Sequence, residues 1–334
     1  MLNLASVKKY DYIGACTFYL GAIIVLLVAQ AFAGTVSAML AGSIPDIAEN
    51  GDFNTAFMII IQLANAGFIA LFCLRFKRRP GCAFVSPSAA KKLDWRDIVL
   101  PMILAAVLLV GMYLPTMWYG YFTTYALHIP PDAGNIELTT PSSVAMIVIA
   151  SVFLAPVCEE TIYRGVLYNG LREEKSAVKS IMLSALAFML MHLSPVQVVF
   201  QFALGVTSAF VMWRTGRLLP CVLLHATANA LALVMQLTPL SAVLDGCVAW
   251  LTGSPVSAAF ITLALFVGAG GAIFVAIKYA FCKGEVEQTP MELTPETEIR
   301  MTARRKDGTV RFYIGIAICA VMLVINLVVL AVGS

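Results

Sequence analysis

Apolar runs long enough to cross a lipid bilayer recur along the whole chain of 334 residues. A membrane-spanning helix needs about 20 apolar residues, because each residue rises about 1.5 Å and the hydrocarbon core is about 30 Å thick. Windows of this size predict nine spans, at residues 13–42, 55–75, 98–126, 143–168, 178–193, 196–213, 218–237, 256–280 and 312–332. The predicted fold class is therefore all-α, a polytopic membrane helix bundle of about nine transmembrane helices.

Charged residues are scarce and unevenly placed. They make up 12% of the chain, about half of the roughly 25% found in soluble domains. If the N-terminus lies inside and the nine spans alternate, all 22 Lys and Arg residues fall on the inner side, as the positive-inside rule requires. The charged residues of the outer connections are then all acidic, namely Asp46, Glu49, Asp52, Asp132, Glu137 and Asp245. This segregation predicts a multi-pass integral membrane protein with a cytoplasmic N-terminus.

The first apolar run and the two long basic connections fit the same membrane topology. The run from Ile13 to Gly42 far exceeds the roughly 7–15 residues of a signal-peptide core, so we expect a retained span. We attribute the basic charge of connections 76–97 and 281–311 to topology and to anionic inner-leaflet lipid, not to nucleic acid. The lipid bilayer is therefore an expected partner. We find no eukaryotic targeting signal, which favours a bacterial plasma membrane.

Two carboxylates and a guanidinium interrupt the fourth predicted span, in the stretch P-V-C-E-E-T-I-Y-R-G at residues 156–165. Each charge in the hydrocarbon region costs roughly 2.5–3.5 kcal/mol, so three of them indicate a functional site. On a helix, Glu160 and Arg164 share a face and can form an ion pair. Glu159 points about 100° away and is left to act. Pro156 should kink the helix and release a backbone carbonyl from its usual partner.

Two histidines and an asparagine occur in neighbouring spans. His192 ends the run F-M-L-M-H, and His225 shares a helix face with Asn229 in H-A-T-A-N. At about 1.5 Å per residue, the depth below the inner membrane boundary is about 14 Å for Glu159, about 12 Å for His225 and about 20 Å for His192. These depths permit the side chains to meet in one polar cavity. The third histidine, His128, falls in an outer connection, and we assign it no role.

A carboxylate and imidazoles in a hydrated pocket can activate water for hydrolysis. The carboxylate accepts a proton, while a histidine holds the water or binds a zinc ion that polarises it. His225 and Asn229, an imidazole and an amide on another helix, suit the stabilisation of a tetrahedral oxyanion. The chain has neither an H-E-x-x-H zinc-peptidase motif nor a G-x-S-x-G nucleophile elbow. Water-mediated hydrolysis is therefore the favoured enzymatic interpretation.

Three motifs, in this order, resemble those of a known family: E-E-T-I-Y-R at 159–164, F-M-L-M-H at 188–192 and H-A-T-A-N at 225–229. They are similar to the EExxxR, FxxxH and HxxxN motifs of the CPBP family, which comprises type II CAAX prenyl endopeptidases and bacterial Abi-type intramembrane proteases. The resemblance covers roughly residues 143–237. It implies an intramembrane endopeptidase that hydrolyses a peptide bond of a peptide or a membrane-associated protein.

The resemblance also implies a role for each matching residue. Glu159 would be the general base, and His192 would hold the attacking water. His225 and Asn229 would donate hydrogen bonds to the oxyanion. Glu160 and Arg164 would shape the pocket. Family members are described both as metalloproteases and as metal-free glutamate enzymes, so a zinc ion on Glu159, His192 and His225 stays open. A prenylated CAAX substrate does not follow, because the flanking spans show no recognised motif.

We treat residues 1–334 as a single membrane domain with a catalytic-type core at 143–237 and flanking spans at 13–126 and 256–332. Two other functions compete with the protease. A non-catalytic immunity or scaffold protein would keep the pocket for structure, and a proton-coupled transporter would use Glu159 and the histidines as a relay. The absence of visible inverted halves in the sequence disfavours the transporter. A structural alternative places the three charges at the inner interface, where they merely reach water.

Overall fold

The computed structural model consists of helices joined by short connections. It describes residues 10–41, 43–44, 47, 50–76, 94–129, 138, 140–251, 253–281 and 295–332, and no strand element lies among them. The helical elements are α1 (Tyr12–Ala41), α2 (Gly51–Phe76), α3 (Arg96–Leu127), α4 (Pro141–Ile147), η2 (Val148–Leu154), α5 (Ala155–Glu160), η3 (Thr161–Tyr168), α6 (Asn169–Glu174), α7 (Ala177–Met191), η4 (Pro195–Gln197), α8 (Val198–Thr215), α9 (Leu218–Leu237), α10 (Leu240–Leu251), α11 (Pro255–Val275), η5 (Ala276–Ala280) and α12 (Pro295–Val332). The all-α prediction is confirmed.

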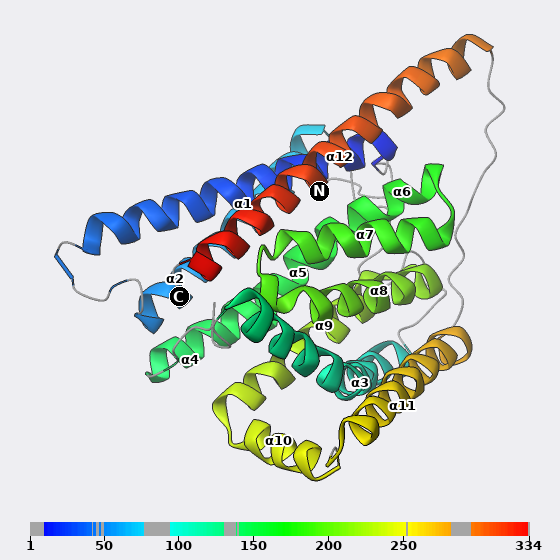
Figure 1. Ribbon diagram of the computed structural model, residues 1–334. Coiled ribbons are helices and arrows are strands. Elements are labelled where there is room, and N and C mark those ends of the chain that lie inside the picture. The colour runs from blue at the N-terminus through cyan, green and yellow to red at the C-terminus, as the bar shows by residue number, and fades with distance from the viewer. Residues whose placement is uncertain are drawn as a thin grey trace.

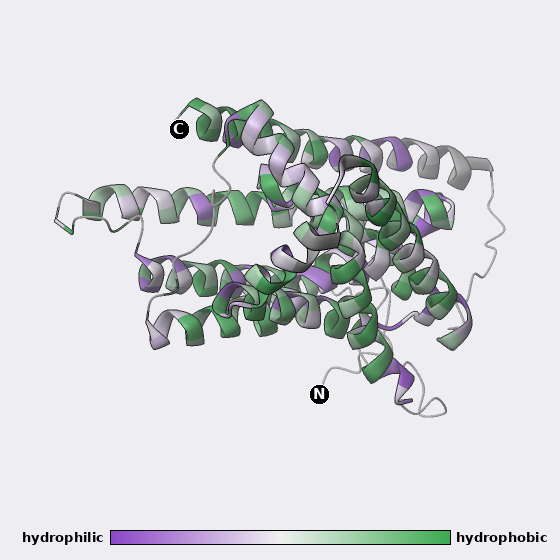
Figure 2. Ribbon diagram, turned by 60° about the horizontal axis from the view of Figure 1, so that its bottom comes forward, coloured by the Kyte–Doolittle hydropathy of each residue, from purple (hydrophilic) through white to green (hydrophobic). Residues whose placement is uncertain are grey.

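Eight helical segments within the described ranges are long and apolar enough to cross a bilayer, and hydrophobic residues predominate along them (Figure 2). They correspond to eight of the nine predicted spans, and the protein is a multi-pass integral membrane protein. The remaining span, predicted at 178–193, is the shorter apolar helix α7. Its 15 residues rise only about 22 Å, less than the hydrocarbon core. The prediction also omits α10 and starts the last helix later than α12 starts.

The helices that carry the predicted site residues lie in the middle of the bundle. α1, α2 and α12 lie along one side, and α3, α10 and α11 along the other (Figure 1). α1 packs against α2, η3, α6 and α12, while α3 packs against α8, α9 and α11. The central helices run from α5 to α9, and α7 and α8 pack closely together. The flanking spans therefore enclose the carboxylates and imidazoles.

The turn between α7 and α8 is hydrogen-bonded to helices of both flanks. Leu193 adopts a left-handed φ of 53°, which ends α7. Asn326 Nδ2 on α12 donates to the Leu193 carbonyl at 2.8 Å, and the Tyr119 hydroxyl on α3 donates to the Pro195 carbonyl at 2.7 Å. Helices from both flanks therefore stabilise the turn that follows His192.

The helix that carries the two glutamates, residues 141–174, is interrupted by the π-helical segments η2 and η3 on either side of α5. At the end of η2 the Ala155 N–H donates to the Ala150 carbonyl, five residues back. The next residue is Pro156, which has no N–H and cannot serve the next carbonyl, that of Ser151. Proline thus releases a carbonyl next to the glutamates, as the sequence predicts. π segments occur frequently at functional sites.

Side-chain contacts join helix ends that the charge pattern assigns to the same side of the membrane. Arg305 Nε donates to Glu174 Oε1 at 2.9 Å, and both residues are predicted to be inside. At the other ends of the helices, the Thr140 hydroxyl donates to Asp52 Oδ1 at 2.6 Å, and both are predicted to be outside. The alternation of spans agrees with these contacts. Outside the described residues lie 77–93 of connection 76–97, 282–294 of connection 281–311, and the acidic residues Asp46, Glu49, Asp132 and Glu137.

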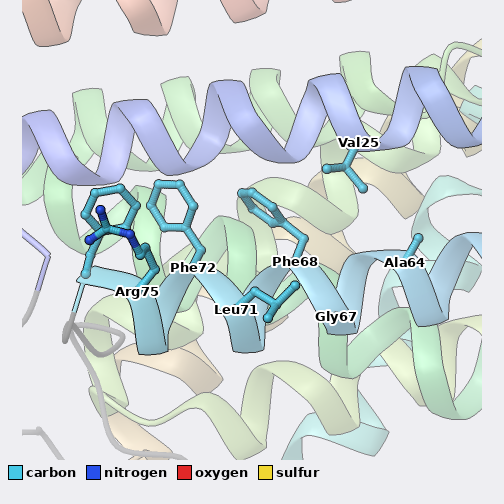
Figure 3. Close-up of a pocket in the computed structure, with 8 residues that line it drawn as sticks. Val25, Ala64, Gly67, Phe68, Leu71, Phe72 and Arg75 are labelled. Atoms are coloured by element: carbon cyan, nitrogen blue, oxygen red, sulfur yellow. The ribbon is translucent and has the colours of Figure 1, made fainter.

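Three apolar hollows occur in the described part of the bundle, one of them along α4 and the start of η2, and none of the predicted site residues lines any of them. Another is a shallow groove of about 460 Å³ between α1 and α2, where Phe68 and Phe72 point from α2 toward α1 and Arg75 lies near one end (Figure 3). The third, of about 480 Å³, is lined by residues of α3, α8, α9 and α10, among them Met112 and Phe200. The candidate site must therefore be built from its polar side chains.

Candidate active site

Glu160 and Arg164 form a fully buried ion pair one helical turn apart, with 3.1 Å between Glu160 Oε1 and Arg164 Nη1. The Ser208 hydroxyl donates to Glu160 Oε2 at 2.6 Å. Arg164 Nη2 donates to the Gly205 carbonyl at 3.0 Å, and the guanidinium lies over the Phe188 ring, 4.4 Å from its centroid. Buried charges need both a partner and hydrogen bonds. Here α5 supplies the charge partner of Arg164 and α8 one hydrogen bond to it, while Arg164 Nε and Nη1 are buried without a hydrogen-bond partner among the described residues.

Gly205 allows α8 to approach α7 closely. A Cβ placed on Gly205 would lie 3.0 Å from the Ala185 Cα and 3.2 Å from the Ala185 carbonyl oxygen. Small residues permit this kind of close helix contact in membranes. The same glycine presents the carbonyl that accepts from Arg164, so helix packing and charge burial depend on one position.

His225, on α9, is almost fully buried and is joined to the ion pair through one ring nitrogen. Its Nδ1 lies 3.0 Å from Glu160 Oε1. An ionised carboxylate only accepts hydrogen bonds, so Nδ1 carries the hydrogen and donates it. In the neutral ring, Nε2 therefore has a lone pair, and it lies 4.0 Å from Glu159 Oε2. Glu160 thus fixes the tautomer and orientation of this imidazole.

His192 immediately follows α7 and is oriented by its own helix. Its Nδ1 lies 2.9 Å from the Phe188 carbonyl oxygen. A carbonyl oxygen only accepts, so Nδ1 again carries the hydrogen. The opposite nitrogen, Nε2, lies 3.9 Å from Glu159 Oε2, and 18% of the side chain is exposed. His192 is thus the more accessible of the two imidazoles.

Glu159 has one oxygen bonded to protein and one that faces the imidazoles. Gln62 Nε2 on α2 donates to Glu159 Oε1 at 3.2 Å. Glu159 Oε2 is buried and has no hydrogen-bond partner within the described part of the chain. Its distances of 3.9 Å and 4.0 Å to the Nε2 atoms of His192 and His225 exceed a direct hydrogen bond and suit a bridging water. The structure therefore brings together three of the predicted residues.

Asn229 lies one turn after His225 on α9 and contacts the broken part of the fourth span. Its Nδ2 donates to the Ser151 carbonyl at 2.7 Å, which is the carbonyl that Pro156 cannot serve. Asn229 therefore ties α9 to η2. An amide nitrogen carries two hydrogens, so this bond uses half of its donor capacity. The contribution of Asn229 to an oxyanion site stays a prediction.

Two residues that contact the glutamates are missing from the sequence prediction. Gln62 bonds Glu159 across 97 residues of chain, and Ser208 bonds Glu160 across 48. Each is a polar residue in a largely apolar helix, which is a general sign of hydrogen bonding between membrane helices. A polar residue in such a helix predicts a buried hydrogen bond, but it does not indicate which residue forms the other half of that bond.

The donor set at Glu159 has the chemistry of a zinc site. Each imidazole presents Nε2 toward Glu159, and each Nδ1–H is held by a carbonyl or carboxylate, as in metal-binding histidines. Tetrahedral zinc ligands lie 2.0–2.1 Å from the metal, hence about 3.3 Å apart, and the separations from Glu159 Oε2 are 3.9 Å and 4.0 Å. Among the residues described, no group of three His, Cys, Asp or Glu side chains meets the spacing of a metal site.

Comparisons with known proteins identify the central segment. Residues 141–231 match the family model described as type II CAAX prenyl endopeptidase Rce1-like. Among curated proteins, the chain is 26% identical over 122 residues to "Putative membrane peptidase YdiL" of Bacillus subtilis, a match that covers 36% of this chain and 50% of that protein. It is 25% identical over 158 residues to an uncharacterized protein of Mycoplasma capricolum, with 43% and 46% covered. No solved structure matches the chain.

The chain spans about half the length of the curated relatives that it matches. The matched segment starts with α4 and ends within α9. It contains all three motifs and therefore both glutamates, the arginine, both intramembrane histidines and the asparagine. The resemblance that the motifs indicate is confirmed, because residues 141–231 of this chain match the model of the type II CAAX prenyl endopeptidase Rce1-like family.

Proposed function

We propose that this protein is an intramembrane endopeptidase that hydrolyses a peptide bond of a peptide or a membrane-associated protein. One observation carries the proposal: Glu159 Oε2, without a protein partner among the described residues, faces the Nε2 atoms of His192 and His225 at 3.9 Å and 4.0 Å. Burying a carboxylate oxygen without a hydrogen-bond partner costs folding free energy, so its presence here indicates a function. The match to a peptidase family gives the reaction class.

Glu159 is the proposed general base. The attacking water donates one hydrogen to Glu159 Oε2 and the other to His192 Nε2, which leaves an oxygen lone pair directed at the scissile carbonyl carbon. As the carbon–oxygen bond forms, the first proton moves to Glu159 Oε2. The same proton then passes to the amide nitrogen that leaves, and the carboxylate is regenerated. His192 holds the water without changing its own protonation state.

His225 and Asn229 are the proposed oxyanion donors. The Nδ1 hydrogen of His225 is given to Glu160, so Nε2 donates to an oxyanion only when the ring carries both protons. One Nδ2 hydrogen of Asn229 goes to the Ser151 carbonyl, and the second is the one offered to the oxyanion. Glu160 and Arg164 act by holding His225 in place, not by touching the substrate.

A zinc-dependent variant of the proposal uses the same side chains. Glu159, His192 and His225 would hold the ion, which would supply a Lewis acid that polarises water and the scissile carbonyl. The residues outside this set keep their roles: Glu160 still orients His225, and the Phe188 carbonyl still orients His192. A chelator distinguishes the two variants, because only the zinc enzyme loses activity and regains it on addition of zinc.

Cleavage assays on the purified full chain test the proposal. The substrates are membrane-inserted and soluble peptides, each with and without a prenylated cysteine. We expect Glu159→Gln, His192→Ala and His225→Ala to lower turnover by about 10²–10⁴-fold, and His128→Ala, on the remaining histidine, to leave it unchanged. Wild-type biological activity in Glu159→Gln would contradict the proposal and favour the scaffold. Proton-coupled flux in proteoliposomes that Glu159→Gln abolishes, without peptide cleavage, would favour a transporter.

A further inference from the structure

Helix α2 lies outside the segment that matches the peptidase family, yet it buries two amide side chains in the bundle. Gln62 is 8% exposed and Asn65 is 5% exposed, while Leu63 on the same helix is 55% exposed. An amide placed inside a membrane bundle needs hydrogen-bond partners. The partners of these two amides show what α2 contributes.

The two amides form a chain that ends at the candidate base. Asn65 Nδ2 donates to Gln62 Oε1 at 3.4 Å, and Gln62 Nε2 donates to Glu159 Oε1 at 3.2 Å. The Asn65 amide nitrogen only donates and the Glu159 carboxylate only accepts, so the oxygen of the Gln62 amide faces Asn65 and its nitrogen faces Glu159. The Cys158 thiol also donates to the Gln62 backbone carbonyl at 3.6 Å. Side chain and backbone of one α2 residue therefore hold α5.

The bond from Gln62 makes the two oxygens of Glu159 different. Oε1 is engaged by α2, and Oε2 is the atom that faces His192 and His225. Without the amide, rotation of the carboxylate would let either oxygen face the imidazoles or turn away from both, since its terminal torsion is broad. Catalytic groups work best when neighbouring hydrogen bonds hold them in the productive orientation.

We propose that Gln62, oriented by Asn65, is a positioning residue that holds the base Glu159 with Oε2 directed at the two imidazoles. The proposal rests on the proposed function and adds to it a helix from outside the family core. Gln62 touches neither water nor substrate. It acts through Glu159, so its loss lowers the rate of the chemical step and leaves substrate binding unchanged.

The test compares kcat and KM for peptide cleavage by the full chain. Gln62→Met keeps the length of the side chain and removes the donor, and we expect kcat to fall about 10–100-fold, as for other supporting residues. KM should stay within about two-fold, because the lost interaction does not bind substrate. Asn65→Leu should lower kcat less. The double variant should match Gln62→Met alone, because Asn65 acts only through Gln62.

Leu63→Ala is the matched control on the exposed face of α2 and should keep wild-type kcat. Equal kcat in Gln62→Met and wild type, with Glu159→Gln inactive, would overturn this inference and leave the proposed function standing. Full activity in Glu159→Gln would overturn the proposed function instead. A rise in KM with unchanged kcat would make Gln62 a binding residue and also overturn the inference. If Gln62→Met does not fold, the kcat of Asn65→Leu decides, and an unchanged value refutes the positioning role.

Discussion

Glu159 and Glu160 are neighbours in one short helix, yet they differ in how many hydrogen bonds and ion pairs the protein gives them. Glu160 is surrounded by Arg164, Ser208 and His225, which engage both of its oxygens. Glu159 has one oxygen bonded to Gln62 and a second oxygen without a partner in the described chain. The difference separates stability from activity. Glu160, with partners on both oxygens, holds the site together, and Glu159, with one oxygen unpaired in the described chain, is left for chemistry.

The largest expected effect comes from replacing each of the two glutamates, one at a time, by glutamine. Glu159→Gln should lower peptide turnover by about 10²–10⁴-fold, while the thermal unfolding temperature in detergent stays close to wild type. Glu160→Gln should lower that temperature, because Arg164 loses its charge partner. Turnover and unfolding are measured on the same preparations. A Glu159→Gln variant less stable than Glu160→Gln would contradict the assignment of Glu160 to stability and Glu159 to activity.

Removal of the buried cation should be almost as costly. Arg164→Met keeps much of the side-chain volume but leaves Glu160 charged and without its ion partner, for which we expect a loss of about 3–5 kcal/mol in unfolding free energy. The double variant Glu160→Gln, Arg164→Met should recover part of that loss, because no unpaired charge is left. An Arg164→Met protein as stable as wild type would show that the pair contributes nothing to the fold.

A smaller effect should follow from the hydroxyl on α8. Ser208→Ala removes the donor to Glu160 Oε2 and leaves a buried acceptor unsatisfied, which costs about 1–3 kcal/mol. The measurement is again thermal unfolding in detergent, with Ser208→Cys as a variant that keeps a weak donor. Loss of turnover at full stability would contradict the assignment of Ser208 to the structural half of the site.

The smallest predicted effect concerns the turn after His192. Asn326→Leu removes the donor to the Leu193 carbonyl, and hydrogen bonds between membrane helices contribute about 0.5–1.5 kcal/mol. We expect a small loss of stability and a measurable loss of turnover, since the turn positions His192. An unchanged turnover with lower stability would show that His192 is held by α7 alone.

The helix pattern and the ion pair could be predicted because both are local. Apolar runs set the spans, and the spacing of Glu160 and Arg164 by four residues places them on one helix face. The predicted depths of Glu159, His192 and His225 allow the contact that the structure shows. The short span predicted at 178–193 matches α7, Ala177–Met191, to within two residues at each end, whereas the left-handed backbone conformation of Leu193 that follows it is not indicated by the sequence.

The remaining contacts depend on tertiary structure. Gln62 meets Glu159 across 97 residues, and no local pattern links them. Asn229 is predicted to stabilise an oxyanion, and its hydrogen bond to the Ser151 carbonyl is a further contact that the sequence does not indicate. Pro156 predicts that one backbone carbonyl lacks its helical donor, but only the packing of α9 against η2 shows which side chain donates to that carbonyl.

The two π segments give the fourth span a fixed angular setting. A π turn holds one residue more than an α turn, so each segment behaves as a helix into which one residue has been inserted. Deleting one residue from η2, such as Val152, would therefore convert the π turn into an α turn and leave the faces of α4 and α5 nearly in place. Deleting one residue from the regular helix α4, such as Ala145, would instead rotate the residues before it by about 100°, so that Thr140 turns away from Asp52 while Glu159 still faces the histidines. Evolution of this segment should therefore accept a change in length within the π turns more readily than in the α-helical turns beside them.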